Sequence, residues 1–546
     1  MSPTRLRTLL AVSLVATLFT AACGGSGGAR SAASGEPVHG GTLTFYDPIQ
    51  YAAWVPTASI WSNSNVAGNV AERLIWQDPK TGDFKPWLAQ SWEISDDKLS
   101  YTFKLRSGVT FSNGDPLDAE TVKLNFDQHG LGDEKLGIPK DSFWTDYAGT
   151  DVVDAQTVKV RITKPNAAFL QIISNYRASS ILGKPFLKLD LAGQGQLTNW
   201  VATGPFTVEK VDGTTGVTLK HRDDYNWAPE GSAHQGKAYL ERIVYKSVPE
   251  ASTRVGALQS GEAQISRNIA PYDEQTIVDG GGTVIGIPVQ GEVNSLKIQL
   301  DTGAPTQDVQ VRLALQAATD RNEINKTVLS PNYPVPSSAL VKGTPFRGDA
   351  SSYLTHDLAK ATSLLEAAGW RAGADGIRVK DAERLEFEIW VAPYYQVAQA
   401  VLELLQAQWK KAGVDLRIRS ASQAEYTAVE AAAAKSTDDD WTFEQGQTST
   451  AEANVLRVSL GAARYNALRF LTPDPTLESL LDAQAVTFDP AQRKAAVQKV
   501  EDRIFEQAYI IPLYDETQVF GLAPSVHGFA TESTGRTWLY DTWLDE

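Results

Sequence analysis

Side chains that could hold a metal ion are sparse and scattered along this chain. Its six histidines stand singly, and no two have the H-E-x-x-H spacing that places two imidazoles on one face of a helix. The acidic run Asp438–Asp440 lacks the alternating ligands of a calcium loop and is typical of a solvated turn. We therefore expect no metal site and no cofactor.

Three short segments match the motifs of serine enzymes in their letters but not in their context. Gly24–Gly28 reads G-x-S-x-G, but a nucleophile elbow needs a strand before it and a helix after it, and a Gly- and Ser-rich tract surrounds it here. Ser95–Lys98 matches S-x-x-K and Lys80–Gly82 matches K-T-G, in reversed order and within turn-forming sequence. No coherent catalytic set results, so we predict that the chain is not an enzyme.

The first 22 residues have the organisation of a secretory signal. Arg5 and Arg7 give it a positively charged start, and the eleven residues Leu9–Phe19 form its apolar core. Eleven residues cannot cross a hydrocarbon core that needs about 20 in a helix. The sequence therefore predicts a cleaved signal peptide over residues 1–22 and an extracytoplasmic protein.

The only cysteine, Cys23, follows two small residues, Ala21 and Ala22. This ending resembles the lipobox of bacterial lipoproteins, with Thr20 where leucine is usual, and implies a diacylglyceryl group on the Cys23 sulfur. A free cysteine beside an ordinary cleavage site is the alternative. Residues 23–37 are rich in Gly, Ser and Ala and are expected to form a flexible tether. A lone cysteine also excludes an intramolecular disulfide.

The length and the net charge of the chain narrow its possible domain organisation and its possible partners. Roughly 520 residues follow the signal, more than the ~250–300 at which a single core stops growing, so two or more lobes are expected. The net charge of −15 argues against nucleic acid as a partner.

Helix and strand patterns alternate along the chain and predict an α/β fold. In 99–106 (LSYTFKLR) apolar and polar residues alternate, as in a half-buried strand. Asp118 and Asp357 each precede a helical pattern as N-caps. Another helix is expected over 396–413, and a last long helix is expected to start at Asp489-Pro490. The succession of helices and strands in the second half predicts an open sheet covered by helices.

The most distinctive sequence motif of the chain lies at 86–126 (PWLAQSWEISDDKLSYTFKLRSGVTFSNGDPLDAETVKLNF). It resembles the hallmark segment of family 5 solute-binding proteins, the oligopeptide, dipeptide and nickel receptors of ABC importers. Further matches follow in the family's order: ATGPF at 202–206, RDDYNW at 222–227, EASTRVGALQSGEAQI at 250–265, DVQVRLALQAATDRNEI at 308–324 and RKAAVQKVEDRIFEQAYIIPLY at 493–514. The resemblance covers about residues 40–546.

The resemblance implies a two-lobed clamp like the type II periplasmic binding proteins, with three structural regions and a ligand cleft between the lobes. The implied regions are domain I at 38–75, 200–287 and 521–546, domain II at 76–199, and domain III at 288–520.

The resemblance also nominates residues for contact with the ligand. They come from the segment after the first strand, from the ATGPF motif, and from domains II and III. The candidates are Tyr46, Asp47, Trp61, Asn63, Phe143, Trp144, Thr203, Gly204, Gln299, Tyr394, Tyr395, Gln445, Gln447 and Thr448. For each aromatic residue among them, packing in a core is the alternative.

The loop 441–457 departs from the pattern of the peptide-binding members. There an aspartate pairs with the amino terminus of the ligand, whereas amide and small side chains stand at 445–448 here. Only Glu444 or Glu452 could replace that aspartate. Because a buried ammonium group without a carboxylate partner is costly, we expect a neutral, amide-rich or modified ligand rather than an ordinary free peptide.

Together these features predict a monomeric receptor, anchored to the membrane through a lipid on Cys23. It would capture a small peptide-like or modified oligomeric solute and deliver it to the permease and ATPase subunits of an ABC importer. Two alternatives stay open: a secreted lipoprotein hydrolase, and a ligand sensor or chaperone built on the same fold.

Overall fold

The computed structural model describes residues 35–52, 54–58, 63–300, 303–433, 442–464, 466–469 and 473–545. The expectations for Cys23, for Trp61 and for the run Asp438–Asp440 fall outside these ranges. The chain divides into two units, residues 1–36 and 37–546, and the fold below is that of the second unit.

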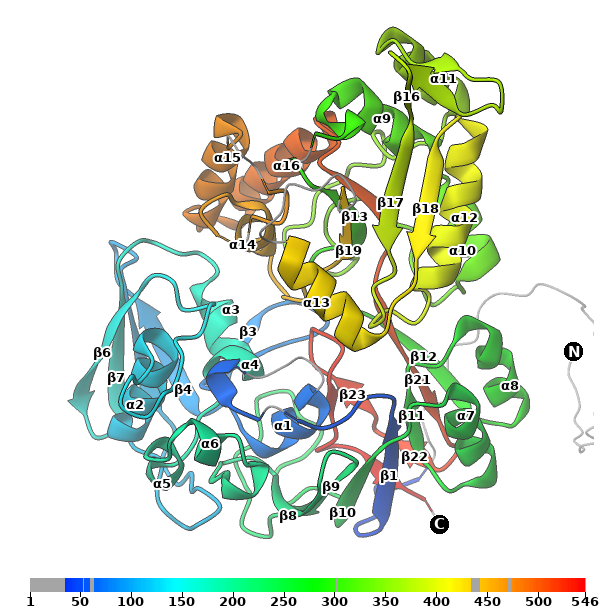
Figure 1. Cartoon of the computed structure of the whole chain (residues 1–546). Helices are drawn as coiled ribbons and strands as arrows, with labels where there is room; N and C mark the ends of the chain where they lie inside the picture. The colour runs from blue at the N-terminus through cyan, green and yellow to red at the C-terminus, as the bar shows by residue number, and fades with distance from the viewer. Residues whose placement is uncertain are drawn as a thin grey trace, which may run out of the picture. The chain divides into compact units, whose positions relative to one another are not determined.

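Residues 37–546 form two lobes of mixed α/β structure (Figure 1). We define the first lobe as residues 38–288 and 517–545, drawn from blue to green with the red C-terminal segment beneath. The second lobe contains residues 289–516 and holds the yellow and orange helices of the upper half of Figure 1.

The largest sheet of the first lobe has seven strands in the order β12-β21-β11-β1-β10-β9-β8. At its centre β1 (Thr42–Asp47) pairs in parallel with both β10 (Arg242–Ser247) and β11 (Ile265–Arg267). The other pairings are antiparallel and involve β8 (Phe206–Asp212), β9 (Gly216–His221), β12 (Thr283–Pro288) and β21 (Thr517–Leu522). Helix α7 (Ala251–Ser260) contacts β11, and α8 (Glu274–Asp279) contacts β12.

A second sheet in the first lobe is antiparallel throughout, in the order β4-β5-β7-β6. Its strands are β4 (Ala89–Ile94), β5 (Ser100–Leu105), β6 (Tyr147–Asp154) and β7 (Thr157–Ile162). Helix α2 (Ala119–Leu131) packs on β6. One apolar core joins both sheets, with Leu43 and Phe45 of β1, Phe103 of β5 and Trp538 all buried.

Short elements complete the first lobe. They are α1 (Ser64–Val70), α3 (Phe169–Ser174), α4 (Tyr176–Ser179), α5 (Lys184–Leu187), α6 (Leu191–Gln194), β2 (Ile75–Gln77), β3 (Phe84–Pro86), β22 (Val526–His527), β23 (Ala530–Thr531), β24 (Thr537–Trp538) and β25 (Trp543–Leu544).

The second lobe contains a three-stranded antiparallel sheet and a parallel strand pair. The sheet is β19 (Phe443–Gly446), β13 (Asn294–Ile298) and β20 (Ile510–Tyr514), and the pair is β17 (Glu386–Trp390) with β18 (Asp415–Arg419). The helices are α9 (Val309–Ala318), α10 (Arg321–Val328), α11 (Leu358–Ala367), α12 (Ala398–Lys411), α13 (Gln423–Ala433), α14 (Val455–Leu460), α15 (Pro475–Ala485) and α16 (Pro490–Glu506). A small antiparallel sheet is formed by β14 (Arg371–Ala372), β15 (Arg378–Lys380) and β16 (Glu383–Arg384).

Two connections join the lobes. Residues 289–293 lead from β12 to β13, and Asp515 and Glu516 lead from β20 to β21. Apolar residues of α7, α8 and β21 join the main core of the second lobe, among them Val255, Ile277 and Val519. The lobes therefore share apolar packing on this side of the molecule.

The helix starts predicted from the sequence are confirmed. Asp118, Asp357 and Asp489 are the N-caps of α2, α11 and α16, and each side chain accepts a backbone N–H three residues further on. The strand predicted over 99–106 is β5. Within the described ranges, the structure contains no helix whose length and apolar character would suffice to span a bilayer.

Candidate functional site

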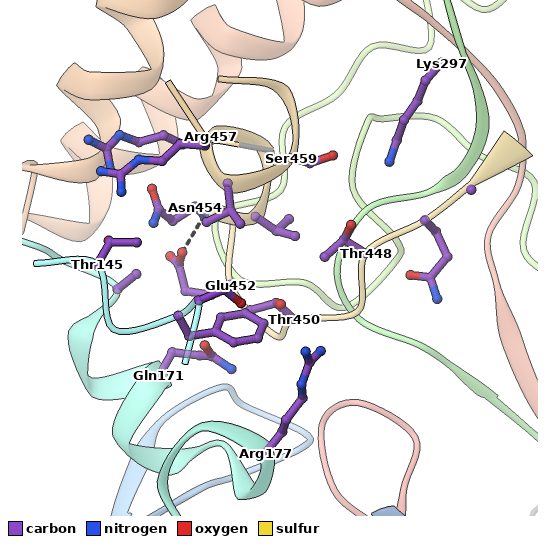
Figure 2. A pocket seen from close by; sticks show the side chains of 18 of the residues that line it. Thr145, Gln171, Arg177, Lys297, Thr448, Thr450, Glu452, Asn454, Arg457 and Ser459 are labelled. Atoms are coloured by element: carbon purple, nitrogen blue, oxygen red, sulfur yellow. Dashed lines mark hydrogen bonds between the residues drawn. The ribbon is translucent and has the colours of Figure 1, made fainter. Parts of the chain in front are cut away.

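A cavity of about 760 Å³ is lined by residues of both lobes (Figure 2). The first lobe contributes residues 142–177, and the second contributes Lys297 of β13 together with segments at 394–395, 426 and 444–464. Its size lies within the range of small-molecule binding sites, which is about 300–1,000 Å³.

The first-lobe wall is built from the loop before β6 and from α3 and α4. The guanidinium of Arg177 lies 5.2 Å from the centre of the Phe143 ring. Asn166 is fixed locally, because its side-chain oxygen accepts the backbone N–H of Ala168 at 3.0 Å. Gln171 of α3 also faces the cavity (Figure 2).

The second-lobe wall follows β19 and the chain after it. Lys297 of β13 is the register partner of Glu444 on β19, so these two opposite charges lie on adjacent strands. The backbone N–H of Gln447 donates to the Tyr395 hydroxyl at 3.1 Å. This bond holds the loop after β19 against the segment that follows β17.

Most of the charged side chains that line the cavity form ion pairs. Lys297 Nζ lies 3.1 Å from Glu292. Glu452 lies 2.5 Å from the Arg493 guanidinium, and although burial raises the pKa of Glu452, the charge of Arg493 opposes that rise.

Arginine side chains of the second lobe are paired in the same way. Arg457 lies 2.8 Å from Asp482, and Arg464 lies 3.9 Å from Asp146 of the first lobe. The second of these pairs bridges the two lobes.

Several polar groups of the second-lobe wall are buried without a hydrogen-bond partner in the described part of the chain. They are the side-chain oxygens of Gln445, Gln447, Thr450 and Ser459. Gln445 is 2% exposed and Ser459 is 1% exposed. Because burying an unpaired polar group costs free energy, these atoms offer hydrogen bonds to an occupant of the cavity.

The structure brings six of the predicted ligand-contact residues together at this cavity. They are Phe143, Tyr394, Tyr395, Gln445, Gln447 and Thr448. Phe143 comes from the first lobe and the other five come from the second.

The other predicted residues that the structure describes lie away from the cavity lining. They are Tyr46, Asp47, Asn63, Trp144, Thr203, Gly204 and Gln299.

Their side chains have partners elsewhere. Asp47 forms a buried ion pair with Arg267 at 2.6 Å, and the Tyr46 hydroxyl donates to Glu262. Gln299 donates to the Ala467 carbonyl at 2.8 Å.

Trp144 and Thr203 likewise have partners within the first lobe. The indole N–H of Trp144 donates to the carbonyl of Ala178 at 2.5 Å within the core. The carbonyl of Thr203 accepts the indole N–H of Trp227 at 3.1 Å.

Sequence reasoning missed Arg177, Gln171, Lys297 and Arg457, which all line the cavity. None of these stands in a distinctive motif, and the chain holds 50 Lys and Arg residues, so charge alone could not select them. Among the described residues, no group of three or more His, Cys, Asp or Glu side chains is placed to hold a metal ion.

The chain is similar to known proteins in sequence and in fold. The sequence model of the family described as "Bacterial extracellular solute-binding proteins, family 5 Middle" matches residues 83–459. The glutathione-binding protein GsiB of Salmonella paratyphi A is 28% identical over 450 residues, which are 81% of this chain and 82% of that protein.

Two solved structures share the fold. NikA from Brucella suis, in complex with Fe(III)-EDTA, superposes with a TM-score of 0.78 and 24% identity, covering 92% of this chain and all of that one. The oligopeptide-binding protein AppA of Bacillus subtilis, in complex with a nonapeptide, gives a TM-score of 0.75 and 18% identity, covering 94% and 100%. At these identities the superpositions show that the chains share a fold, which is the two-lobed α/β fold.

Proposed function

The chain belongs to the family 5 bacterial extracellular solute-binding proteins, and from this premise we propose that it captures a small peptide-like solute in the cavity between its lobes and delivers it to the permease of an ABC importer. The observation that carries the proposal is the cavity itself, since both lobes supply its walls and unpartnered polar groups face it.

The mechanism follows from the position of the cavity. A solute that contacts both walls has more contacts when the lobes are together, so its binding favours the closed arrangement. The rim is bridged by the backbone N–H of Ala167, which donates to the carbonyl of Ala485 at 2.8 Å, and by the pair Asp146–Arg464. A permease that recognises this closed arrangement would receive the solute without chemistry on it.

We include in this proposal the more detailed expectations from the sequence. The three-domain division, a monomeric state, and a neutral, amide-rich or modified solute are consistent with this cavity. We favour a receptor over a lipoprotein hydrolase because most of the charged side chains that line the cavity are engaged in ion pairs. A sensor or chaperone role would use the same cavity.

The anchor is a separate part of the proposal. A diacylglyceryl group on Cys23, with residues 23–37 as tether, would hold the receptor at the outer side of the cell membrane. Stable attachment needs more than one acyl chain, because a single chain binds only marginally. Cys23→Ala should release the protein to the medium with unchanged solute affinity, as fractionation and titration would measure. Undiminished membrane retention would contradict the anchor.

The capture function is tested by finding the solute. Native mass spectrometry of the mature protein would detect a co-purified molecule. A thermal-shift screen would then compare glutathione, short peptides, oligosaccharides and metal chelates such as Fe(III)-EDTA. A solute at 100 times its dissociation constant stabilises the folded state by about 2.7 kcal/mol.

A matched pair of variants shows whether the shift arises in the cavity. Thr448→Trp would fill space at the second-lobe wall and should abolish the shift. Thr214→Trp places the same side chain on the exposed turn between β8 and β9 and should leave the shift unchanged. A shift that survives in Thr448→Trp would show that the solute binds elsewhere.

A further inference from the structure

Tyr394 is a large aromatic side chain that the fold leaves exposed in the cavity wall. It is 46% exposed, and of the large apolar side chains that stay exposed in the described part of the chain, it alone lines the cavity. An aromatic ring contributes a large apolar area when it leaves water. Tyr394 therefore offers this area to an occupant of the cavity.

Two further tyrosines meet Tyr394 edge to face. The ring centre of Tyr395 lies 5.8 Å away with an interplanar angle of 86°, and that of Tyr426 lies 5.4 Å away at 90°. All three residues line the cavity, and we call them the aromatic corner. Perpendicular pairs at these distances are a favoured arrangement of aromatic rings. The corner is therefore a stable cluster in which Tyr394 is the most exposed ring.

The parallel strand pair of the second lobe brings these rings together. Tyr394 and Tyr395 follow the carboxyl end of β17, and α13, which carries Tyr426, follows the carboxyl end of β18 (Figure 1). Parallel strands end at the same edge, and ligands of α/β proteins bind in the space beyond that edge. The topology therefore places the corner where a binding site is expected.

Neighbouring groups fix the base of the corner. The hydroxyl of Tyr395 accepts the backbone N–H of Gln447 at 3.1 Å. Tyr426 is 1% exposed and packs in a small apolar cluster with Ala392. Because these two rings are already held, a solute group that packs on Tyr394 requires little further ordering of the protein.

The exposure of the three rings restricts the group that fits the corner. An aromatic cage for a quaternary ammonium presents several ring faces to one point, whereas Tyr426 is buried here and Tyr395 is half-buried. A flat ring that stacks on Tyr394, or meets it edge to face, requires only the one exposed ring. The corner therefore favours a flat ring over a cation.

We propose that the solute carries an aromatic ring or another flat ring, which packs against Tyr394 in the aromatic corner. The inference rests on the cavity being the solute site, as proposed above. It adds a ring-bearing group to a solute whose amide groups suit the unpartnered amides and hydroxyls of the second-lobe wall.

A set of alanine tripeptides tests the proposal. Each position in turn carries alanine, phenylalanine, cyclohexylalanine or trimethyllysine, and every peptide is made with a free and with an acetylated amino end. Calorimetric titration of the mature protein should show, at one position, that the phenylalanine peptide binds about tenfold or more tightly than the alanine peptide, because its ring leaves water. It should also bind about twofold or more tightly than the cyclohexylalanine peptide, whose ring is apolar but not flat.

Variants of Tyr394 connect that preference to the residue. Tyr394→Ala should remove the preference for phenylalanine, whereas Tyr394→Phe keeps the ring and should keep the preference. Tyr394→Leu keeps an apolar side chain at the position and should remove only the preference for phenylalanine over cyclohexylalanine. Tyr272→Ala is the matched control and should change neither preference, because Tyr272 is 79% exposed in the first lobe, outside the cavity lining.

The outcomes separate this inference from the function itself. Phenylalanine and alanine peptides that bind alike at every position, or a preference that persists in Tyr394→Ala, would overturn the inference and leave the receptor function standing. Cyclohexylalanine or trimethyllysine peptides that bind as tightly as the phenylalanine peptides would do the same.

If no tripeptide binds, the solute identified by the broader screen takes their place. A ring-bearing solute should bind about tenfold more weakly to Tyr394→Ala than to the wild-type protein. Unchanged binding, or a solute without a ring, would overturn the inference. Absence of binding in both experiments would contradict the receptor function as well.

Discussion

Gly204 is fixed by the backbone of the helix beside it. Its N–H donates to the carbonyl of Val70 at 2.9 Å, at the end of α1. A Cβ atom at this position would lie 2.3 Å from that same carbonyl oxygen, closer than any real contact. Glycine is therefore required here for close approach of two backbone segments.

Gly204→Ala should lower the free energy of unfolding by about 1–3 kcal/mol, because two backbone segments must move apart. Urea denaturation would measure the change. Gly256→Ala is the matched control, because its Cβ would meet nothing within 4 Å on the exposed side of α7. As alanine favours a helix interior, that variant should gain about 0.5–1 kcal/mol. Equal effects at the two sites would contradict the steric account.

Glu516 is a half-buried carboxyl at one of the two connections between the lobes. Burial raises its pKa to about 7, although a hydrogen bond from the Asn294 side chain at 3.2 Å opposes the rise. The Glu516 carboxyl therefore stays protonated in the folded protein at pH values where the same carboxyl in the unfolded chain, with a pKa near 4.5, has lost its proton. The stability that this group contributes is full below pH 4.5 and is lost as the pH rises through 7.

Glu516→Gln should accordingly flatten the pH dependence of unfolding. Relative to this variant, the wild-type protein should lose on the order of 3 kcal/mol between pH 4.5 and 8. Chemical denaturation over this range would measure the difference. Glu120→Gln, an exposed change on α2, should follow the wild-type profile. A wild-type curve parallel to that of Glu516→Gln would contradict the raised pKa.

Some residues of the candidate site could be predicted from the sequence, and others could not. Gln445, Gln447 and Tyr395 could be nominated because they lie at positions that correspond to ligand-contacting segments of the family, although the loop with the two glutamines departs from the family's pattern. Arg177 could not, because its place in the cavity wall depends on how the chain folds. The pairing of Glu452 with Arg493 is of the same kind, since the two residues meet only after folding.

At the scale of elements, local signals were sufficient for many helices and strands. An aspartate before an apolar stripe marked the start of α2, α11 and α16, because its side chain satisfies backbone N–H groups that the helix leaves unpaired. The order of strands in the seven-stranded sheet was not accessible in this way. There β1 lies between strands some 200 residues further along the chain, and β21 joins from the C-terminal end.

The cap of α16 gives a test at this scale. Asp489 accepts the backbone N–H of Gln492 at 2.9 Å, with Pro490 at the first helical position. Asp489→Ala should lower the free energy of unfolding by about 1 kcal/mol, because that N–H loses its acceptor. Asp489→Asn keeps an acceptor and should cost much less. Thermal unfolding of both variants would measure the effects, and equal losses would contradict a capping role.

At the scale of the whole molecule, the sequence predicted two lobes from length and from resemblance, and the structure has two. The assembly of the cavity could not be derived from composition or periodicity, because its walls come from segments near residues 142–177 and 444–464. Such contacts depend on how the two lobes meet, which is decided by the two connecting segments and by packing at α7 and α8.

Contacts across the cavity rim should contribute to solute affinity, because solute binding favours closure and these contacts form when the lobes meet. Asp146 of the first lobe lies 3.9 Å from Arg464 of the second. Asp146→Lys replaces attraction by repulsion, so the solute identified by screening should bind about 2–10-fold more weakly and dissociate faster. Titration and stopped-flow dissociation would measure both. Asp151→Lys is the matched control, because Asp151 pairs with Arg161 within the first lobe. An affinity lost equally in both variants would indicate a general charge effect rather than a contact that holds the lobes together.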